Sequence, residues 1–264
     1  PMDDLNAVES LLSGLGGATA AALYTVVILI AIVAVISIIT NIWLGIAYHK
    51  YNRTENSAGL TGEETARRIL DRNGLEKIKV KVTGSLMFGN SYSHYFKKVR
   101  LRRLTRNKTS LTALAMGSQK AALAVLDKEN DPDMKKRIRL TPLIYLGPIA
   151  LIPLIVIGVL IDIVVFNGDG NSAMIASVIG IIFYALSLAL SILNLRTEKK
   201  GQERAYELLR ENGMATENEI SELHKLFKLY NIQYINDIIM STLELIYRIL
   251  LIFSKSDSSS SDNN

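Results

Sequence analysis

The sequence predicts a mainly α-helical, polytopic membrane protein with three or four transmembrane helices and a small α+β lobe on its cytoplasmic side. Two observations lead to this fold class. Of the 264 residues, 49% are hydrophobic and 21% are charged, which excludes a disordered or fibrous chain. All 30 Lys and Arg residues lie in 48–141 or 196–264, and none lies in 1–47 or 142–195. Basic residues are therefore absent from the long apolar segments, as in membrane proteins.

Three apolar runs are long enough to cross the hydrocarbon core of a bilayer, which takes about 20 residues of helix. They are Leu23–Tyr48, Leu143–Phe166 and Ala173–Leu195. The first is the predicted transmembrane helix 23–48. The other two are joined by a short polar turn and form a predicted transmembrane hairpin over 142–195.

A fourth apolar stretch, Ile232–Phe253, is interrupted by Asp237, Glu244 and Arg248. Glu244 and Arg248 are four residues apart and could pair on one helical face. An amphipathic helix and a short fourth span both fit this pattern, and the sequence leaves the two open.

The distribution of charge predicts the orientation. Residues 48–141 carry 21 basic and 9 acidic residues, whereas residues 1–22 carry three acidic residues and no basic one. By the positive-inside rule, segment 1–22 lies outside the cell membrane, and 49–141 forms a cytoplasmic lobe. Residues 196–253 return to the cytoplasm as helices, and the Ser-rich tail 254–264 is expected to be disordered. The chain is thus expected to be a multi-pass protein of the cell membrane.

The lobe begins with a clear helix signal. Thr61 and Glu64 form a capping box, and the helix that follows ends at Asn73-Gly74. Alternating charged and apolar residues predict strands in Lys77–Val82 and Lys97–Leu104. Ser110–Leu126 predicts a helix with one apolar face and with Gln119 and Lys120 on its polar side.

The residue types exclude several kinds of chemistry. The chain has no Cys, which excludes disulfides, a thiol nucleophile and Cys-ligated zinc. Of the three His residues, His49 and His224 have no partner at metal-ligand spacing. No P-loop, nucleotide fingerprint or nucleophile elbow is present. Asp162 is the only carboxylate inside a predicted span, and it is either a hydrated interfacial residue or an ion site.

The densest cationic cluster includes Lys97, Lys98, Arg100, Arg102 and Arg103. The preferred interpretation is a solvated cytoplasmic face, and near a membrane such clusters often contact anionic lipid. No groove-reading or aromatic-interleaved motif supports nucleic acid as a partner.

Two segments carry a family resemblance. Residues 57–70, SAGLTGEETARRIL, followed by Asn73-Gly74-Leu75, closely resemble the opening of the bacterial membrane-bound neutral zinc metallopeptidases of the YugP type. His94-Tyr95 with Lys98-Val99-Arg100-Leu101 is similar to the D-H-Y-D-P…K-x-V-x-L stretch of that family. The order of elements agrees over residues 57–253. The resemblance therefore implies a membrane-bound fold in which one helix carries H-E-V-G-H-A and a later one carries E-F-N-A-S-x-R-A.

At the family's zinc site, this sequence departs from the pattern. Gln119, Lys120 and Leu123 stand where the resemblance places the first His, the Glu and the second His. Glu198 matches the third ligand, and Arg204 matches the Arg of the later motif. A zinc peptidase needs two imidazoles one turn apart and a Glu to activate water. The resemblance thus implies no catalytic residue, no metal and no cofactor, and it predicts an ion pair between Lys120 and Glu198.

The sequence-based hypothesis is a catalytically inactive, zinc-metallopeptidase-like membrane protein that acts as a scaffold or binding subunit. Its expected partners are the lipid bilayer and other membrane proteins. Two alternatives remain open. One is an active membrane hydrolase with an atypical site that uses His94 and Glu198. The other is a membrane transport component built on the Pro-containing hairpin and Asp162.

Overall fold

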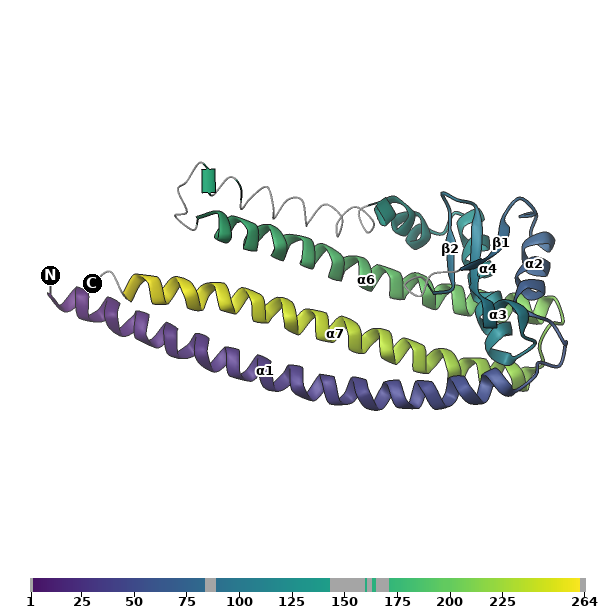
Figure 1. The fold of residues 1–264 in the computed structure, drawn as a ribbon, viewed down its shortest axis with the longest axis horizontal. Coiled ribbons are helices and arrows are strands. Elements are labelled where there is room, and N and C mark those ends of the chain that lie inside the picture. Colours follow the sequence, from purple (N-terminus) through teal and green to yellow (C-terminus); the bar gives the residue numbers. More distant parts are fainter. Residues whose placement is uncertain (1, 84–88, 143–159, 161–162, 165–170, 262–264) are drawn as a thin grey trace. The chain divides into compact units, whose positions relative to one another are not determined.

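The structure, a computed structural model, describes residues 2–83, 89–142, 160, 163–164 and 171–261 (Figure 1). The chain is mainly helical with one small sheet, as predicted. Its elements are α1 (Met2–Arg53), α2 (Gly62–Arg72), β1 (Lys79–Thr83), β2 (Ser91–Ser93), β3 (Lys98–Arg102), α3 (Arg103–Asn107), α4 (Leu111–Lys128), α6 (Asn171–Glu211) and α7 (Glu217–Ser261). Residues 132–142 are also helical.

The chain divides into two compact units. One comprises residues 1–38, 145–189 and 236–264, and the other, which we call the lobe, comprises residues 39–144 and 190–235. The predicted lobe ended near residue 141. In the structure, residues 190–235 share the hydrophobic core of residues 39–144, through Leu208, Leu209 and Phe227 among others.

Helix α2 forms where the sequence predicts it, because both of its ends are capped. The Thr61 side chain accepts from the Glu64 amide, and the Glu64 carboxylate accepts from the Thr61 amide at 2.8 Å. Gly74, which follows the C-cap Asn73, has a φ of +64°, a backbone conformation that a Cβ disfavours.

The sheet has the order β1-β3-β2, with β1 parallel and β2 antiparallel to β3. The central strand is β3, whose Val99 and Leu101 are fully buried. The alternation of apolar and charged residues in β3 therefore reflects one face packed on the core. The two long strands match the predicted ones, whereas the three-residue β2 was not predicted.

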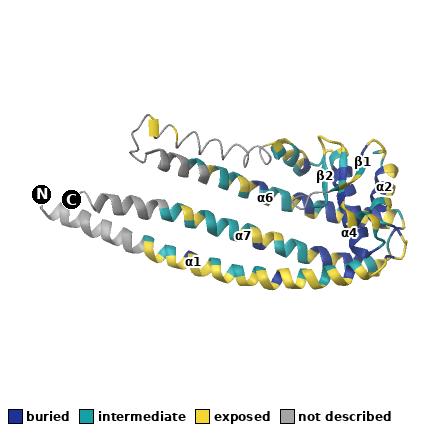
Figure 2. Ribbon diagram, in the orientation of Figure 1, coloured by how far each residue is buried: buried dark blue, intermediate teal, exposed yellow. Residues whose placement is uncertain are grey.

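Helix α4 is the central element of the lobe. All 16 residues from Leu111 to Leu126 are buried, and Figure 2 shows α4 among the dark blue segments. A Cβ on Gly117 would collide with the backbone of Gly62, so α2 and α4 touch backbone to backbone. Gln119 and Lys120, which the sequence placed on the polar side of this helix, are only 4% and 7% exposed. The periodicity of one helix does not reveal that other elements cover its second face.

The unit made of residues 1–38, 145–189 and 236–264 holds most of the predicted membrane segments, whereas their residues 39–48 and 190–195 belong to the lobe. Among the described residues, one helical segment, Thr19–Arg53 of α1, is long and apolar enough to span a membrane. Its apolar side chains are largely exposed, for example Ile38 at 60% and Ile46 at 65%. The run Leu143–Phe166, with Asp162, lies almost entirely outside the described residues. The third run lies within α6, where many of the first side chains are also outside them.

The fourth apolar stretch lies within the continuous helix α7. Glu244 accepts a hydrogen bond of 2.6 Å from the Tyr184 hydroxyl of α6, and the Arg248 guanidinium lies 5.5 Å from the centre of the Tyr184 ring. Among the described residues no ion pair joins Glu244 to Arg248, the pair that their spacing allowed, and both side chains contact Tyr184. The structure also continues α7 to Ser261, into the tail expected to be disordered.

Candidate functional site

Glu198 lies on the face of α6 that packs against α4. Its neighbours Thr197, Gly201 and Gln202 are buried with it. A Cβ on Gly201 would lie 2.7 Å from the Leu123 side chain of α4, so glycine permits the close approach of the two helices. This approach brings the Glu198 carboxylate to the polar residues of α4.

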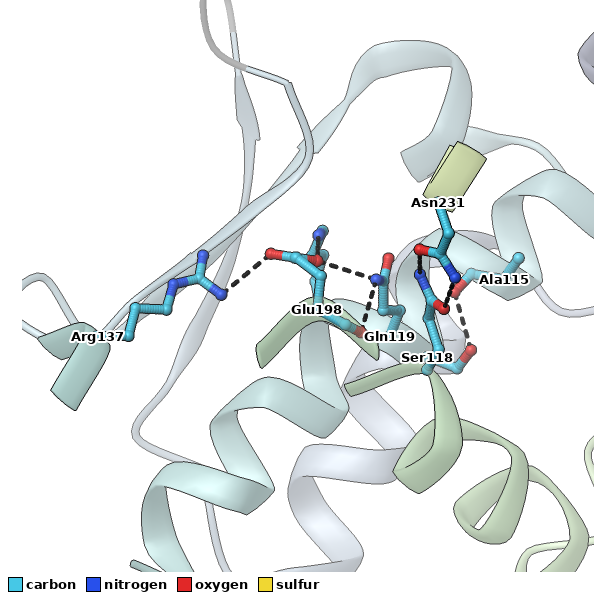
Figure 3. Close-up of polar contacts among 8 residues, drawn as sticks. Ala115, Ser118, Gln119, Arg137, Glu198 and Asn231 are labelled. Carbon is cyan, nitrogen blue, oxygen red and sulfur yellow. Dashed lines mark hydrogen bonds and ion pairs between the residues drawn. The ribbon is translucent and has the colours of Figure 1, made fainter. Parts of the chain in front are cut away.

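Three side chains hydrogen-bond to this carboxylate, as Figure 3 shows for Gln119 and Arg137. The Lys120 Nζ lies 2.5 Å and the Gln119 Nε2 lies 2.9 Å from Glu198 Oε2. The Arg137 Nη1 donates to Glu198 Oε1 at 3.0 Å. The predicted Lys120–Glu198 ion pair is thus confirmed. Arg137, which lies on the helix 132–142, was missed, because nothing in its local sequence separates it from the neighbouring basic residues.

The charge of Glu198 is stabilised by these partners. Burial alone raises the pKa of the Glu198 carboxyl. The charges of Lys120 and Arg137, and the hydrogen bonds that they donate, outweigh burial and hold this pKa below its usual value of 4.5. The carboxylate therefore stays ionised at neutral pH as the centre of a two-cation cluster.

A second polar contact lies beside this cluster, between α6 and α7. The amides of Gln202 and Asn231 exchange two hydrogen bonds, of 2.9 Å and 2.8 Å (Figure 3). Each amide thus satisfies the other, and α7 is held next to the carboxylate. Sequence analysis missed both residues, because a single Gln and a single Asn 29 positions apart carry no local signal.

A pocket of about 400 Å³ opens over the cluster, and all of its lining residues belong to the lobe. Its charged lining residues are Arg102, Lys120, Arg137 and Glu198. Three tyrosines also line it, namely Tyr48 of α1 and Tyr230 and Tyr234 of α7. The pocket is therefore cationic and aromatic.

The other predicted site residues lie elsewhere. The His94 Nδ1 is 2.6 Å from Asp127 Oδ2, and this oxygen also accepts from the Tyr92 hydroxyl. The Tyr95 hydroxyl donates to the Ile138 carbonyl. Arg204 pairs with the carboxylates of Glu129 and Glu207. None of these three predicted residues is among the described residues that line the Glu198 pocket.

Comparison with known protein families identifies the family of this chain. A family model described as "Putative neutral zinc metallopeptidase" matches residues 26–253. The chain belongs to this family. It is also 27% identical over 207 residues to a Bacillus subtilis (strain 168) protein named "Putative membrane protease YugP", covering 78% of this chain and 86% of that protein. No solved structure matches the chain.

The residues around Glu198 do not fit the zinc ion that the metallopeptidase family implies. Zinc sites in proteins use imidazole, thiolate and carboxylate ligands. Here the groups that contact the carboxylate are an ammonium, a guanidinium and an amide, and two of them are cations that repel Zn²⁺. Within the described residues, no three His, Cys, Asp or Glu side chains gather as metal ligands.

The buried cluster generates a prediction about stability. Replacing Lys120 by Met leaves Glu198 with one cationic partner in a site where both side chains of the pair are about nine-tenths buried. We expect a loss of about 3 kcal/mol in the free energy of unfolding, because the buried Glu198 carboxylate loses the nearer of its two cations. Thermal unfolding of the detergent-purified protein measures it. The double variant Lys120→Met/Glu198→Gln should lose less than the sum of the single variants.

Lys199→Met is the matched control for this experiment, because Lys199 is an exposed neighbour of Glu198 on α6. It should change stability by no more than about 0.5 kcal/mol. Equal losses for Lys120→Met and Lys199→Met would contradict the buried ion cluster.

The lowered pKa of Glu198 predicts a dependence of stability on pH. Since this pKa is lower in the folded than in the unfolded protein, the cluster contributes stability above pH 4.5, and the contribution is lost as the pH falls through the folded-state pKa. In Glu198→Gln, unfolding midpoints measured between pH 7 and 3 should therefore fall less steeply than in the parent. Glu203→Gln, which removes an exposed carboxylate of the same helix, should keep the parental slope. A parental slope in Glu198→Gln would be inconsistent with the lowered pKa.

Proposed function

We propose that this protein is a membrane-bound, catalytically inactive member of the neutral zinc metallopeptidase family that acts as a scaffold or binding subunit. One observation carries the proposal. The Lys120 ammonium lies 2.5 Å from the Glu198 carboxylate, at the place where the family resemblance puts the zinc-activated water and its base. The Lys120 side chain thus places its positive charge where a peptidase needs a metal ion.

The sequence supports the same proposal. By the resemblance, Gln119 and Leu123 stand at the positions of the two zinc-binding imidazoles. An amide is a poor zinc ligand, and an alkyl side chain cannot bind zinc. Leu123 is fully buried and packs against Gly201 of α6, so the structure uses this position for packing between helices. The three histidines of the sequence stand at 49, 94 and 224, too far apart in sequence to form the family's paired motif.

An active hydrolase with an atypical site is the second candidate, and one observation favours it. His94 and Asp127 form a pair in which Asp127 contacts Nδ1 and leaves the other ring nitrogen for proton transfer. However, His94 lines a pocket with Asp127 and Tyr92, while Glu198 lines a different one. The two residues on which this candidate relied thus do not share a pocket. The transport alternative rested on Asp162, which lies outside the described residues.

We propose a multi-pass topology with the N-terminus outside and the lobe in the cytoplasm, with the bilayer and other membrane proteins as partners. The apolar segment Thr19–Arg53 and the name of the Bacillus relative support a place in the membrane. Anionic lipid, rather than nucleic acid, is the proposed partner of the basic cluster. The Lys98 Nζ lies 4.6 Å, and the Arg100 guanidinium 5.7 Å, from the centre of the exposed Phe96 ring next to this cluster. This combination of aromatic and cationic side chains suits a lipid interface.

The inactive-enzyme proposal predicts the metal content. Detergent-purified protein should hold well below one zinc per chain by elemental analysis, and it should not cleave denatured casein. The triple variant Gln119→His/Lys120→Glu/Leu123→His recreates the family's motif on α4 beside Glu198. It should take up close to one zinc per chain, because two imidazoles one turn apart then join a carboxylate.

The parent protein with Glu198→Ala is the control, and its zinc content should match that of the parent. One zinc per chain in the parent protein, absent from the Glu198→Ala variant, would contradict the proposal. Chelator-sensitive cleavage of casein by the parent would do the same.

The proposed orientation is tested by labelling, because the chain has no Cys of its own. Ser10→Cys should react with a membrane-impermeant maleimide in intact cells. Glu76→Cys, at an exposed position of the lobe, should react only after permeabilisation. Labelling of Glu76→Cys in intact cells would reverse the topology.

A further inference from the structure

The pocket beside Glu198 carries an excess of positive charge. Arg102, Lys120 and Arg137 line it together with one acidic residue, Glu198. The formal charge of its described lining residues is therefore +2. Lys120 and Arg137 already exceed the single negative charge of Glu198, and Arg102 adds a third cation, so the lining favours an anionic ligand.

The internal contacts leave donors for such a ligand. A Lys ammonium has three N–H groups and an Arg guanidinium has five. Within the described residues, the side chains of Lys120 and Arg137 each make one hydrogen bond, to Glu198. The side chains of both are largely buried, with 9% and 18% exposed, so their remaining donors lie in a protected site where a charge-assisted hydrogen bond is strong.

Arg102 supplies the third charge from another wall of the pocket. Its backbone amide donates to the Asn90 Oδ1 at 2.7 Å, which fixes the end of β3 beside the start of β2. Burial raises the pKa of Tyr230 to about 12, and the positive charge of Arg102 opposes this rise. Arg102 and Tyr230 both line the pocket, so its cations come from β3, α4 and the helix 132–142.

The size and the place of the pocket point to the class of ligand. A volume of about 400 Å³ suits a small molecule or a headgroup, because ligand pockets measure roughly 300–1,000 Å³. Tyr48 belongs to the wall of the pocket and lies near the end of the apolar segment of α1, where Lys50 and Arg53 follow. Lipid phosphates lie at the depth where an apolar span meets its first basic residues.

We propose that this pocket binds a phosphomonoester, and that its source is the headgroup of an anionic phospholipid. Arg137 and Arg102 hold the phosphate oxygens, with Lys120 behind them. A phosphomonoester carries a charge of about −1.5 to −2 at neutral pH, which complements the charge of the lining residues. This assignment rests on the proposed function, since a zinc-loaded site would leave no place for the Lys120–Glu198 pair.

Isothermal titration calorimetry of the full chain in a non-ionic detergent tests the assignment. The probes are dihexanoyl phosphatidic acid, glycerol 3-phosphate, dihexanoyl phosphatidylcholine and succinate. The variant Arg137→Gln removes one cation while Glu198 keeps Lys120, and Arg139→Gln removes an exposed cation from the same helix. Circular dichroism verifies that both variants keep the parental fold.

Phosphatidic acid should bind the parent, and its affinity should fall at least about tenfold in Arg137→Gln but not in Arg139→Gln. Phosphatidylcholine and succinate should bind far more weakly. Equal binding of glycerol 3-phosphate would support the phosphate site and overturn the lipid source. Failure of both phosphate probes, equal binding of succinate, or equal losses in the two variants would overturn the assignment. The proposed function fails separately, by the zinc content and casein cleavage of the same preparation.

Discussion

Burial of helix α4 on all sides is the constraint on which the rest of the lobe depends. A helix enclosed in this way leaves its polar side chains no water, and an unpaired buried charge costs several kcal/mol. Lys120 and Gln119 must therefore find partners inside the protein, and both find Glu198 of α6. The approach that allows this contact depends on small residues, since Gly117 meets α2 and Gly201 meets Leu123. The close approach of α4 and α6 thus permits the Lys120–Glu198 pair, and the pair in turn makes the burial of both charges tolerable.

Under the proposed function, the ion cluster explains how the fold keeps a buried carboxylate at the Glu198 position without a metal ion. A carboxylate at the position of Glu198 needs a positive charge nearby in a buried site, whether that charge comes from a metal or from side chains. Here two side chains from separate elements supply it, Lys120 from α4 and Arg137 from the helix 132–142. In the function that we propose, the cluster stabilises the fold and turns the cleft from a hydrolytic site into a cationic pocket.

The sequence by itself determined that the chain is mainly helical with a small sheet, and it determined the elements with local signals. The capping box at Thr61 and Glu64, the stop at Asn73-Gly74 and the helix that begins after Ser110 depend on contacts within a few residues, so they can be read from the chain. The family resemblance also predicted the contact between Lys120 and Glu198, which are 78 positions apart. The order of the family's motifs carries information about such contacts that no local pattern contains.

Only the tertiary structure decided which charges form the site. Arg137 stands among Lys135, Lys136 and Arg139, and nothing in this run marks the one that reaches Glu198. The resemblance suggested His94 as a site residue, but His94 pairs with Asp127 and does not line the Glu198 pocket. The full burial of α4 was equally hidden, because hydrophobic periodicity reports the face of a helix that meets one partner, whereas α4 also packs against α6. Long-range packing selects partners by their position in space, and a sequence pattern records only spacing along the chain.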